Sequence, residues 1–178
     1  MAGIQIHDKL FIPFLSAGRI KERVSVLAGK INVAYANKNP LLIGILNGSF
    51  IFAADLFREL SIEAEISFIK LASYKGTSTT GHVITAIGLE ENLQGRHVII
   101  VEDIIDTGKT MSSFLPEVYL RQPASVKIAA FLTKPKALKY EVKADFTAFE
   151  IEDKFVVGYG LDYDGLGRNL PDLYVLND

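Results

Sequence analysis

Three carboxylates and several small polar residues follow a short apolar segment of the chain, which reads VIIVEDIIDTGKT from Val98 to Thr110. Ionised side chains are not tolerated in a sheet covered on both faces unless they are paired. We therefore expect Glu102 and Asp103 to lie at or beyond the carboxyl end of a buried strand, where open α/β sheets bind their ligands. Carboxylates accept hydrogen bonds from hydroxyls and bind hard cations such as Mg2+, so this pair suits a sugar with vicinal hydroxyls.

The residues after Ile105 are predicted to form a turn that enters a helix. Thr107 and Thr110 offer hydroxyls, and Gly108 allows a close backbone approach or a positive φ angle. Amides that open a helix attract an anion through their unpaired N–H groups and the helix dipole, so the predicted ligand of this turn is a phosphate. A Walker A loop is excluded because Asp103 stands where its first glycine would be, and no G-x-G-x-x-G motif occurs.

The length and composition of the chain fit one globular domain. The chain has 178 residues, of which 49% are hydrophobic and 22% are charged. A formal net charge of −2 gives no electrostatic footprint for nucleic acid, and the lack of cysteine excludes disulfides, thiolate nucleophiles and cysteine-based zinc sites. Neither a signal peptide nor an apolar stretch of about 18 residues is found, so we expect a cytoplasmic protein with no membrane partner.

Apolar periodicity predicts the elements that position the acidic segment. A helix over residues 17–36 follows Ser16, a second helix follows Ser49, and a third is shortened or kinked by Pro116. Besides the strand from Val98, strands are predicted at Leu41–Leu46, Glu63–Leu71, His82–Leu89, Val126–Leu132, Ala144–Ile151, Phe155–Tyr159 and Asp172–Leu176, with the third helix at Met111–Leu120. This alternation is typical of an α/β fold with a mainly parallel sheet.

The acidic segment resembles the signature of type I phosphoribosyltransferases, and its adjacent glutamate and aspartate resemble the 6-oxopurine branch of that family. A second segment, DKFVVGYGLDY from Asp153 to Tyr163, resembles the purine-binding end of that branch. The resemblance implies one domain over residues 1–178, with a central, mainly parallel sheet flanked by helices. It also implies a small hood built from the terminal segments, a mobile loop, and a homodimer or homotetramer.

The resemblance gives a role to each polar group of the acidic segment. Ribose and its 5'-phosphate would be bound by Glu102, Asp103, Asp106, Thr107, Gly108, Lys109 and Thr110. Mg2+ would be held by Glu102 and Asp103, and a second ion by Asp162. Asp106 would also exchange a proton with the base as the catalytic acid or base, and we expect its side chain to be partly buried.

A second turn, at the end of the strand that precedes it, would bind pyrophosphate. The residues that the resemblance implies there are Leu46, Asn47, Gly48 and Arg168. Many relatives carry lysine at the position of Asn47, joined to its neighbour by a cis peptide, and lysine again at Ala72. Arg168 would partly supply the missing charge. A plain turn capped by Ser49 explains this stretch about equally well when it is considered alone.

The purine would be bound by Lys134, Phe155, Val156 and Asp162. In the family the lysine donates to the oxygen at C6, the aromatic ring stacks on the base, and the backbone reads the base edge. An ammonium group only donates, so it favours a 6-oxo group over the 6-amino group of adenine. From position alone, Lys134 could instead be solvated and Phe155 could belong to the core. The family's lid loop would begin at Ser73 and Tyr74.

These features imply transfer of ribose 5-phosphate from 5-phospho-α-D-ribosyl 1-pyrophosphate to N9 of a 6-oxopurine in purine salvage. Hypoxanthine and guanine are the expected bases, with xanthine and, on weaker grounds, adenine as alternatives. A regulator that binds nucleotide without turnover is a second alternative, against which Asp106, the loop and Arg168 all argue. A Rossmann dinucleotide enzyme fits less well because its glycine fingerprint is missing.

Overall fold

A six-stranded sheet in the order β5-β4-β3-β6-β7-β8 forms the centre of the molecule. The structure is a computed structural model that describes residues 3–73 and 83–177. The strands are β3 (Leu41–Leu46), β4 (Glu65–Ser73), β5 (Val83–Ile87), β6 (His97–Ile105), β7 (Ser125–Thr133) and β8 (Phe146–Glu150). Only the β4–β5 pair is antiparallel, so the carboxyl ends of the other strands meet at one edge. The predicted α/β class with a mainly parallel sheet is confirmed.

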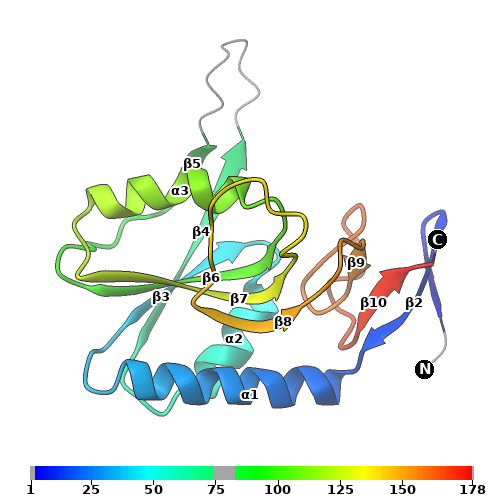
Figure 1. The fold of residues 1–178 in the computed structure, drawn as a ribbon, viewed down its shortest axis with the longest axis horizontal. Coiled ribbons are helices and arrows are strands. Elements are labelled where there is room, and N and C mark those ends of the chain that lie inside the picture. Colours follow the sequence, from blue (N-terminus) through cyan, green and yellow to red (C-terminus); the bar gives the residue numbers. More distant parts are fainter. Residues whose placement is uncertain (1–2, 74–82, 178) are drawn as a thin grey trace, which may run out of the picture.

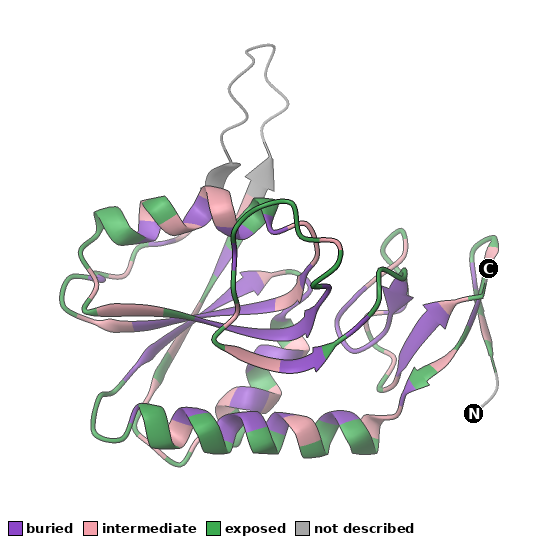
Figure 2. Cartoon of the chain, viewed as in Figure 1, coloured by how far each residue is buried: buried purple, intermediate pink, exposed green. Residues whose placement is uncertain are grey.

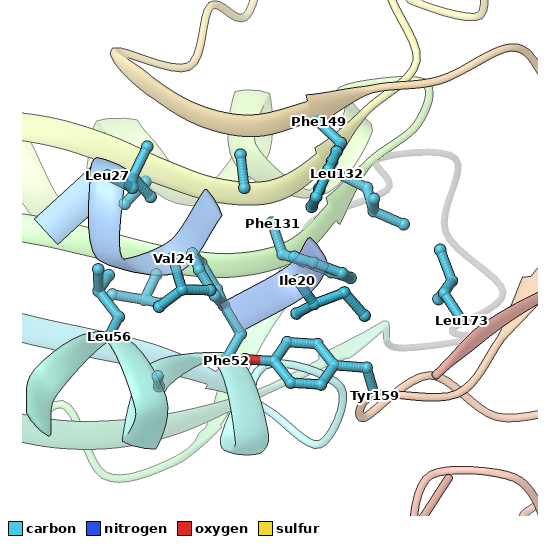
Figure 3. Packing of buried hydrophobic residues seen from close by; sticks show 14 of the residues in the cluster. Ile20, Val24, Leu27, Phe52, Leu56, Phe131, Leu132, Phe149, Tyr159 and Leu173 are labelled. Carbon is cyan, nitrogen blue, oxygen red and sulfur yellow. The ribbon is translucent and has the colours of Figure 1, made fainter. Parts of the chain in front are cut away.

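Helices cover both faces of this sheet. Helices α1 (Ala17–Ala34) and α2 (Phe50–Arg58) lie on one face and α3 (Lys109–Leu120) lies on the other (Figure 1). The predicted cap of α1 is present, since the Ser16 hydroxyl accepts a hydrogen bond from the backbone N–H of Arg19 at 3.3 Å. The buried stripes of α1 and α2 pack on aromatic and aliphatic residues of β7 (Figure 3), while the outer face of α1 is exposed (Figure 2).

A second, four-stranded sheet is built from the two ends of the chain. Its order is β1-β2-β10-β9, with all neighbours antiparallel. The strands are β1 (Ile4–Ile6), β2 (Lys9–Leu15), β9 (Val156–Val157) and β10 (Leu173–Leu176). Phe11, Val157 and Tyr174 form the centre of a small buried cluster on this sheet. Because β9 belongs to it, the sheet holds the segment around residues 155–168 beside the carboxyl edge of the central sheet (Figure 1).

Several boundaries differ from the prediction. The strand expected at Phe155–Tyr159 is reduced to two residues because Gly158 and Tyr159 have φ angles of +104° and +49°, which turn the backbone out of the extended region. Helix α3 begins at Lys109 and continues through Pro116 to Leu120. In the part of the chain that the structure describes, no helix is both long and apolar enough to cross a membrane.

Candidate active site

The adjacent carboxylates lie where β6 loses one of its neighbours. β3 pairs with β6 only as far as Val101, whereas β7 pairs with it up to Ile105. Glu102 and Asp103 therefore belong to the strand, and the prediction that both lie at or beyond its end is wrong in this respect. The physical reason for the prediction still applies in part, because the strand is open on its β3 side from Glu102 onward.

Burial dominates the electrostatics of this pair. Glu102 is 7% exposed, and its Oε2 atom has no hydrogen-bond partner among the described residues. Burial raises the pKa of Glu102 well above its usual range, and the neighbouring charge of Asp103 raises it further. Burial also raises the pKa of Asp103, although its Oδ1 atom accepts a hydrogen bond from the Ile104 N–H at 2.8 Å. A buried carboxylate beside a partly buried one, with no ion pair to either among the described residues, suits a positively charged or hydroxyl-bearing ligand.

The turn after β3 lies against these carboxylates. The peptide bond between Leu46 and Asn47 is cis, as the family resemblance implies. A Cβ atom added to Gly48 would overlap the Asp103 carboxylate, so the backbone of the turn approaches the acid directly. The hydroxyl of Ser49 is fully buried and donates to the Ile45 carbonyl at 2.7 Å, so it neither caps α2 nor faces a ligand.

The predicted phosphate turn joins β6 to α3. Gly108 has a φ angle of +82° and caps α3, a backbone conformation that favours glycine. The carbonyl of Thr107 accepts hydrogen bonds from the N–H groups of Lys139 at 2.9 Å and Tyr140 at 3.2 Å, which fix the turn to the β7–β8 connection. A cavity of about 250 Å³ is lined by Glu102, Ile104, Ile105, Asp106, Thr107, Gly108, Lys109, Thr110 and Met111. All the predicted sugar-phosphate residues except Asp103 thus surround one space, and Asp103 lines the neighbouring cavity.

Lys134 is a buried ammonium group at the end of β7. It is 6% exposed, so the alternative that it is simply solvated is wrong. Its Nζ atom lies 3.1 Å from Asp153 Oδ1 and 3.4 Å from Asp106 Oδ2. The Asp106 side chain is 48% exposed.

A second cavity of about 250 Å³ adjoins these groups, lined by Asp103, Ile104, Asp106, Lys134, Phe155, Val156, Leu161 and Asp162. Phe155 is 45% exposed, so assigning it to the core is wrong. Its ring centroid lies 6.1 Å from that of Phe11 and 5.7 Å from that of Tyr163, so apolar neighbours support the exposed ring. An aromatic ring, a buried ammonium and a carboxylate around one cavity suit a flat heterocycle that carries a hydrogen-bond acceptor.

Arg168 holds the segment of the chain that touches the turn after β3. Its guanidinium donates to the Gly160 carbonyl at 2.7 Å and forms an ion pair with Asp162 at 2.6 Å. A Cβ atom added to Gly160 would overlap the Gly48 carbonyl, so the two backbones touch. The positive charge of Arg168 also acts to lower the pKa of Asp103, against the larger effect of burial. Arg168 is thus close to the turn that the resemblance assigns to pyrophosphate.

Asp162 lines the base cavity, but its carboxylate is not free to act as the predicted metal ligand. Asp162 is occupied by Arg168 and by the Gly165 N–H at 2.7 Å, and no group of three or more histidine, aspartate or glutamate side chains in the described part of the chain could hold a metal ion alone. Of the predicted lid loop, Tyr74 lies outside the described residues, and Ser73 ends β4 with only its backbone described.

Sequence reasoning missed three contributors to the site. Asp153 contacts Lys134, Gly160 packs on the turn at Gly48, and the Tyr159 hydroxyl donates to Asp55 Oδ2 at 2.8 Å, which ties the small sheet to α2. All three missed residues, Asp153, Tyr159 and Gly160, belong to the segment DKFVVGYGLDY. The signal was therefore present in the sequence, but the partners are distant in the chain.

The fold and the two cavities define an α/β protein with two neighbouring spaces, one suited to an anion beside carboxylates and one suited to a flat heterocycle. The model of the phosphoribosyl transferase domain matches residues 14–164. A hypoxanthine-guanine phosphoribosyltransferase of Streptococcus pneumoniae is 42% identical over 165 residues, which cover 92% of each chain. A hypoxanthine-guanine-xanthine phosphoribosyltransferase of Tritrichomonas foetus is 38% identical over 160 residues, covering 89% of this chain and 87% of its own.

Solved structures agree with the sequence comparison. A crystal structure of a hypoxanthine-guanine phosphoribosyltransferase from Bacillus anthracis superposes with a TM-score of 0.87 at 34% identity, covering 94% of this chain and 97% of the other. The chain belongs to the phosphoribosyl transferase family.

Proposed function

We propose that this protein is a purine salvage enzyme that transfers the 5-phosphoribosyl group from 5-phospho-α-D-ribosyl 1-pyrophosphate to N9 of hypoxanthine and guanine. The products are the purine nucleoside 5'-monophosphate and pyrophosphate. The observation that carries this proposal is the cavity in which Lys134, Phe155 and Asp106 meet Asp103 from the sugar side. The names of the relatives support the same choice of base.

The sugar side of the reaction is assigned to the carboxylates and the two turns. Glu102 and Asp103 accept hydrogen bonds from the ribose hydroxyls, and the N–H groups that open α3 bind the 5'-phosphate. The bond from the anomeric carbon to pyrophosphate breaks early, and pyrophosphate leaves with the bonding electron pair. The turn at Leu46, Asn47 and Gly48, together with Arg168, stabilises the charge on this leaving group.

The base side is assigned to the second cavity. Phe155 stacks on the purine, the backbones of Val156 and Asp162 read its edge, and Lys134 donates a hydrogen bond to the 6-oxo group. The N9 lone pair forms the new bond to the anomeric carbon, and the proton on N7 passes to Asp106, so charge and atoms balance. Holding both reactants in adjacent cavities supplies much of the acceleration through orientation.

Mg2+ fits this proposal as a cofactor. The unpartnered Oε2 atom of Glu102 and the raised pKa values of Glu102 and Asp103 indicate a pair of carboxylates that a cation would compensate. Mg2+ usually takes one or two carboxylates and completes its shell with water and phosphate oxygens, so this pair is sufficient. When bound, the ion would neutralise charge on pyrophosphate. A role for Asp162 with a second ion requires Arg168 to release it.

The proposal extends to the organisation of the protein. We assign residues 1–178 to a single domain in which the four-stranded sheet acts as a hood over the base, and we assign Ser73 and Tyr74 to a lid. We further propose that the protein is a homodimer or homotetramer in the cytoplasm. Its partners are small-molecule substrates, and it has no nucleic-acid partner. Light scattering on the purified protein measures the oligomeric state, and a monomer in the presence of substrate would contradict that part.

The direct test is nucleotide formation with purified protein, Mg2+, phosphoribosyl pyrophosphate and hypoxanthine, guanine, xanthine or adenine in parallel. Hypoxanthine and guanine should be converted and adenine should not. An Asp106→Asn variant should be slower by about 100-fold or more, because general acid or base catalysis typically contributes that much. Conversion of adenine at a comparable rate would overturn the role of Lys134. Tight nucleotide binding without conversion of any base would favour the regulator instead.

A further inference from the structure

Lys134 is held by two carboxylates from different parts of the chain. Asp153 Oδ1 lies 3.1 Å from its Nζ atom, and Asp106 Oδ2 lies 3.4 Å away. The Asp153 side chain is 66% exposed and that of Lys134 only 8% exposed, so the contact joins a surface carboxylate to a buried ammonium group. An ammonium group has three N–H donors in a tetrahedral arrangement. Two carboxylate partners therefore leave one donor for a ligand in the cavity.

We propose that Asp153 is a positioning residue for base recognition, which holds the Lys134 ammonium in place and keeps it from pairing with Asp106 alone. This inference rests on the proposed function of Lys134 as the donor to a 6-oxo group. Without Asp153, the strongest remaining attraction on Lys134 would be the single carboxylate of Asp106. The ammonium would then move toward Asp106, away from the base, and would occupy the group assigned to proton transfer.

The backbone presents Asp153 at a fixed point. Just before it, the N–H of Ile151 donates to the carbonyl of Thr133 at 2.9 Å, which joins this segment to the end of β7 that carries Lys134. Just after it, the N–H of Leu176 donates to the carbonyl of Phe155 at 2.9 Å. Asp153 is thus anchored on both sides, to the strand of the lysine and to the sheet of the base-stacking ring.

Stability is not the expected contribution of this ion pair. A pair in which one carboxylate is largely exposed adds little to the free energy of folding, because water screens it. What the second carboxylate changes is the direction of the remaining donor, and with it the discrimination between an acceptor and a donor at C6 of the purine. Asp153 should therefore act on selectivity and leave folding nearly unchanged.

The test compares Asp153→Asn with Glu152→Gln. Both changes remove one negative charge from adjacent exposed residues, but among the described residues the only ion pair of Glu152 is with Lys154, at 3.2 Å. Calorimetric titration should show that Asp153→Asn binds inosine 5'-monophosphate about tenfold more weakly, the usual size of one lost charged hydrogen bond, while its weak binding of adenosine 5'-monophosphate is unchanged. Glu152→Gln should bind both nucleotides like the wild type, and Asp153→Glu should recover part of the lost affinity.

Two outcomes overturn the inference. Equal binding by Asp153→Asn and the wild type would mean that Asp153 does not position Lys134, and equal weakening toward both nucleotides would mean that its role is only structural. Because binding needs no turnover, the proposed function is judged separately by nucleotide formation in the wild type. If the wild type is active, Asp153→Asn should raise KM for hypoxanthine more than it lowers kcat and leave KM for phosphoribosyl pyrophosphate unchanged.

Discussion

Replacing Gly48 by alanine should damage the site through a single contact. The added Cβ atom would overlap the Oδ2 and Cγ atoms of Asp103 and would lie 3.2 Å from its Oδ1 atom. The other side of the turn offers no relief, because the Gly48 carbonyl packs on the backbone of Gly160. Either the turn or the carboxylate must therefore move by about 1 Å or more, and a misplacement of that size typically costs about 100-fold in rate.

The assay is steady-state nucleotide formation with varied phosphoribosyl pyrophosphate. Gly48→Ala should lower kcat/KM for phosphoribosyl pyrophosphate by about 100-fold, because both the turn and Asp103 are assigned to that substrate. Gly29→Ala is the matched control, since a Cβ atom at Gly29 in the exposed face of α1 meets nothing within 4 Å. The control should keep full activity and gain roughly 0.5–1 kcal/mol of stability from the better helix propensity of alanine.

A double variant separates the contact from general damage to the fold. If overlap with Asp103 destabilises Gly48→Ala, then Gly48→Ala combined with Asp103→Ala should lose less stability than the sum of the two single variants. Additive losses in the free energy of unfolding would show that the overlap is relieved elsewhere. Activity of Gly48→Ala within about twofold of the wild type would refute the argument, because a displaced carboxylate cannot leave the rate so nearly unchanged.

Two further predictions concern stability. Because the folded-state pKa of Glu102 is raised above its usual value of 4.5, its contribution is fully present below that value and is lost as the pH rises through the raised pKa. Glu102→Gln should therefore be more stable than the wild type at pH 8 by roughly 1–3 kcal/mol in metal-free buffer, with little difference at pH 4.5. Urea unfolding at the two pH values measures the free energy of unfolding of each protein. A stability difference that does not grow with pH would contradict the prediction. Tyr159→Phe should lower the free energy of unfolding by about 1 kcal/mol, because the buried Tyr159 hydroxyl donates to Asp55. Tyr163→Phe should lower it less, because the Tyr163 hydroxyl donates to the exposed Asp8. Equal losses in the two variants would count against the argument.

The fold could be predicted from the sequence where burial on both faces leaves a continuous apolar run. The segment Leu41–Leu46 forms a strand as predicted. It lies between β4 and β6, and every position up to Ile45 is buried, so its apolar run is continuous. Prediction failed where backbone geometry, which periodicity does not report, decides the outcome. The apolar run that includes Phe155 looks like a strand, but positive φ angles at Gly158 and Tyr159 convert its second half into a turn.

The site could be predicted from the sequence where its members are close along the chain. The residues from Glu102 to Thr110 form one motif, and all of them except Asp103 line one cavity, while Asp103 lines the neighbouring one. The contacts of Lys134 could not be predicted, because its partners are distant along the chain. Helix α3 and strand β7 separate Asp106 from Lys134, and strand β8 separates Lys134 from Asp153. Only the parallel pairing of β6, β7 and β8 brings these three residues to one edge.

The distribution of charge across this edge follows the order of the proposed reaction. On the sugar side, Glu102 is buried and its Oε2 atom has no hydrogen-bond partner among the described residues, so a cationic or hydroxyl-bearing ligand would offset the cost of burying it beside Asp103. On the base side, Lys134 is buried with two anions, so its charge is already compensated before the base arrives. The free energy of phosphoribosyl pyrophosphate binding should therefore include relief of the carboxylate pair, whereas binding of the neutral base should not. This asymmetry favours binding of the hydroxyl-bearing sugar substrate, together with its cation, before the neutral purine.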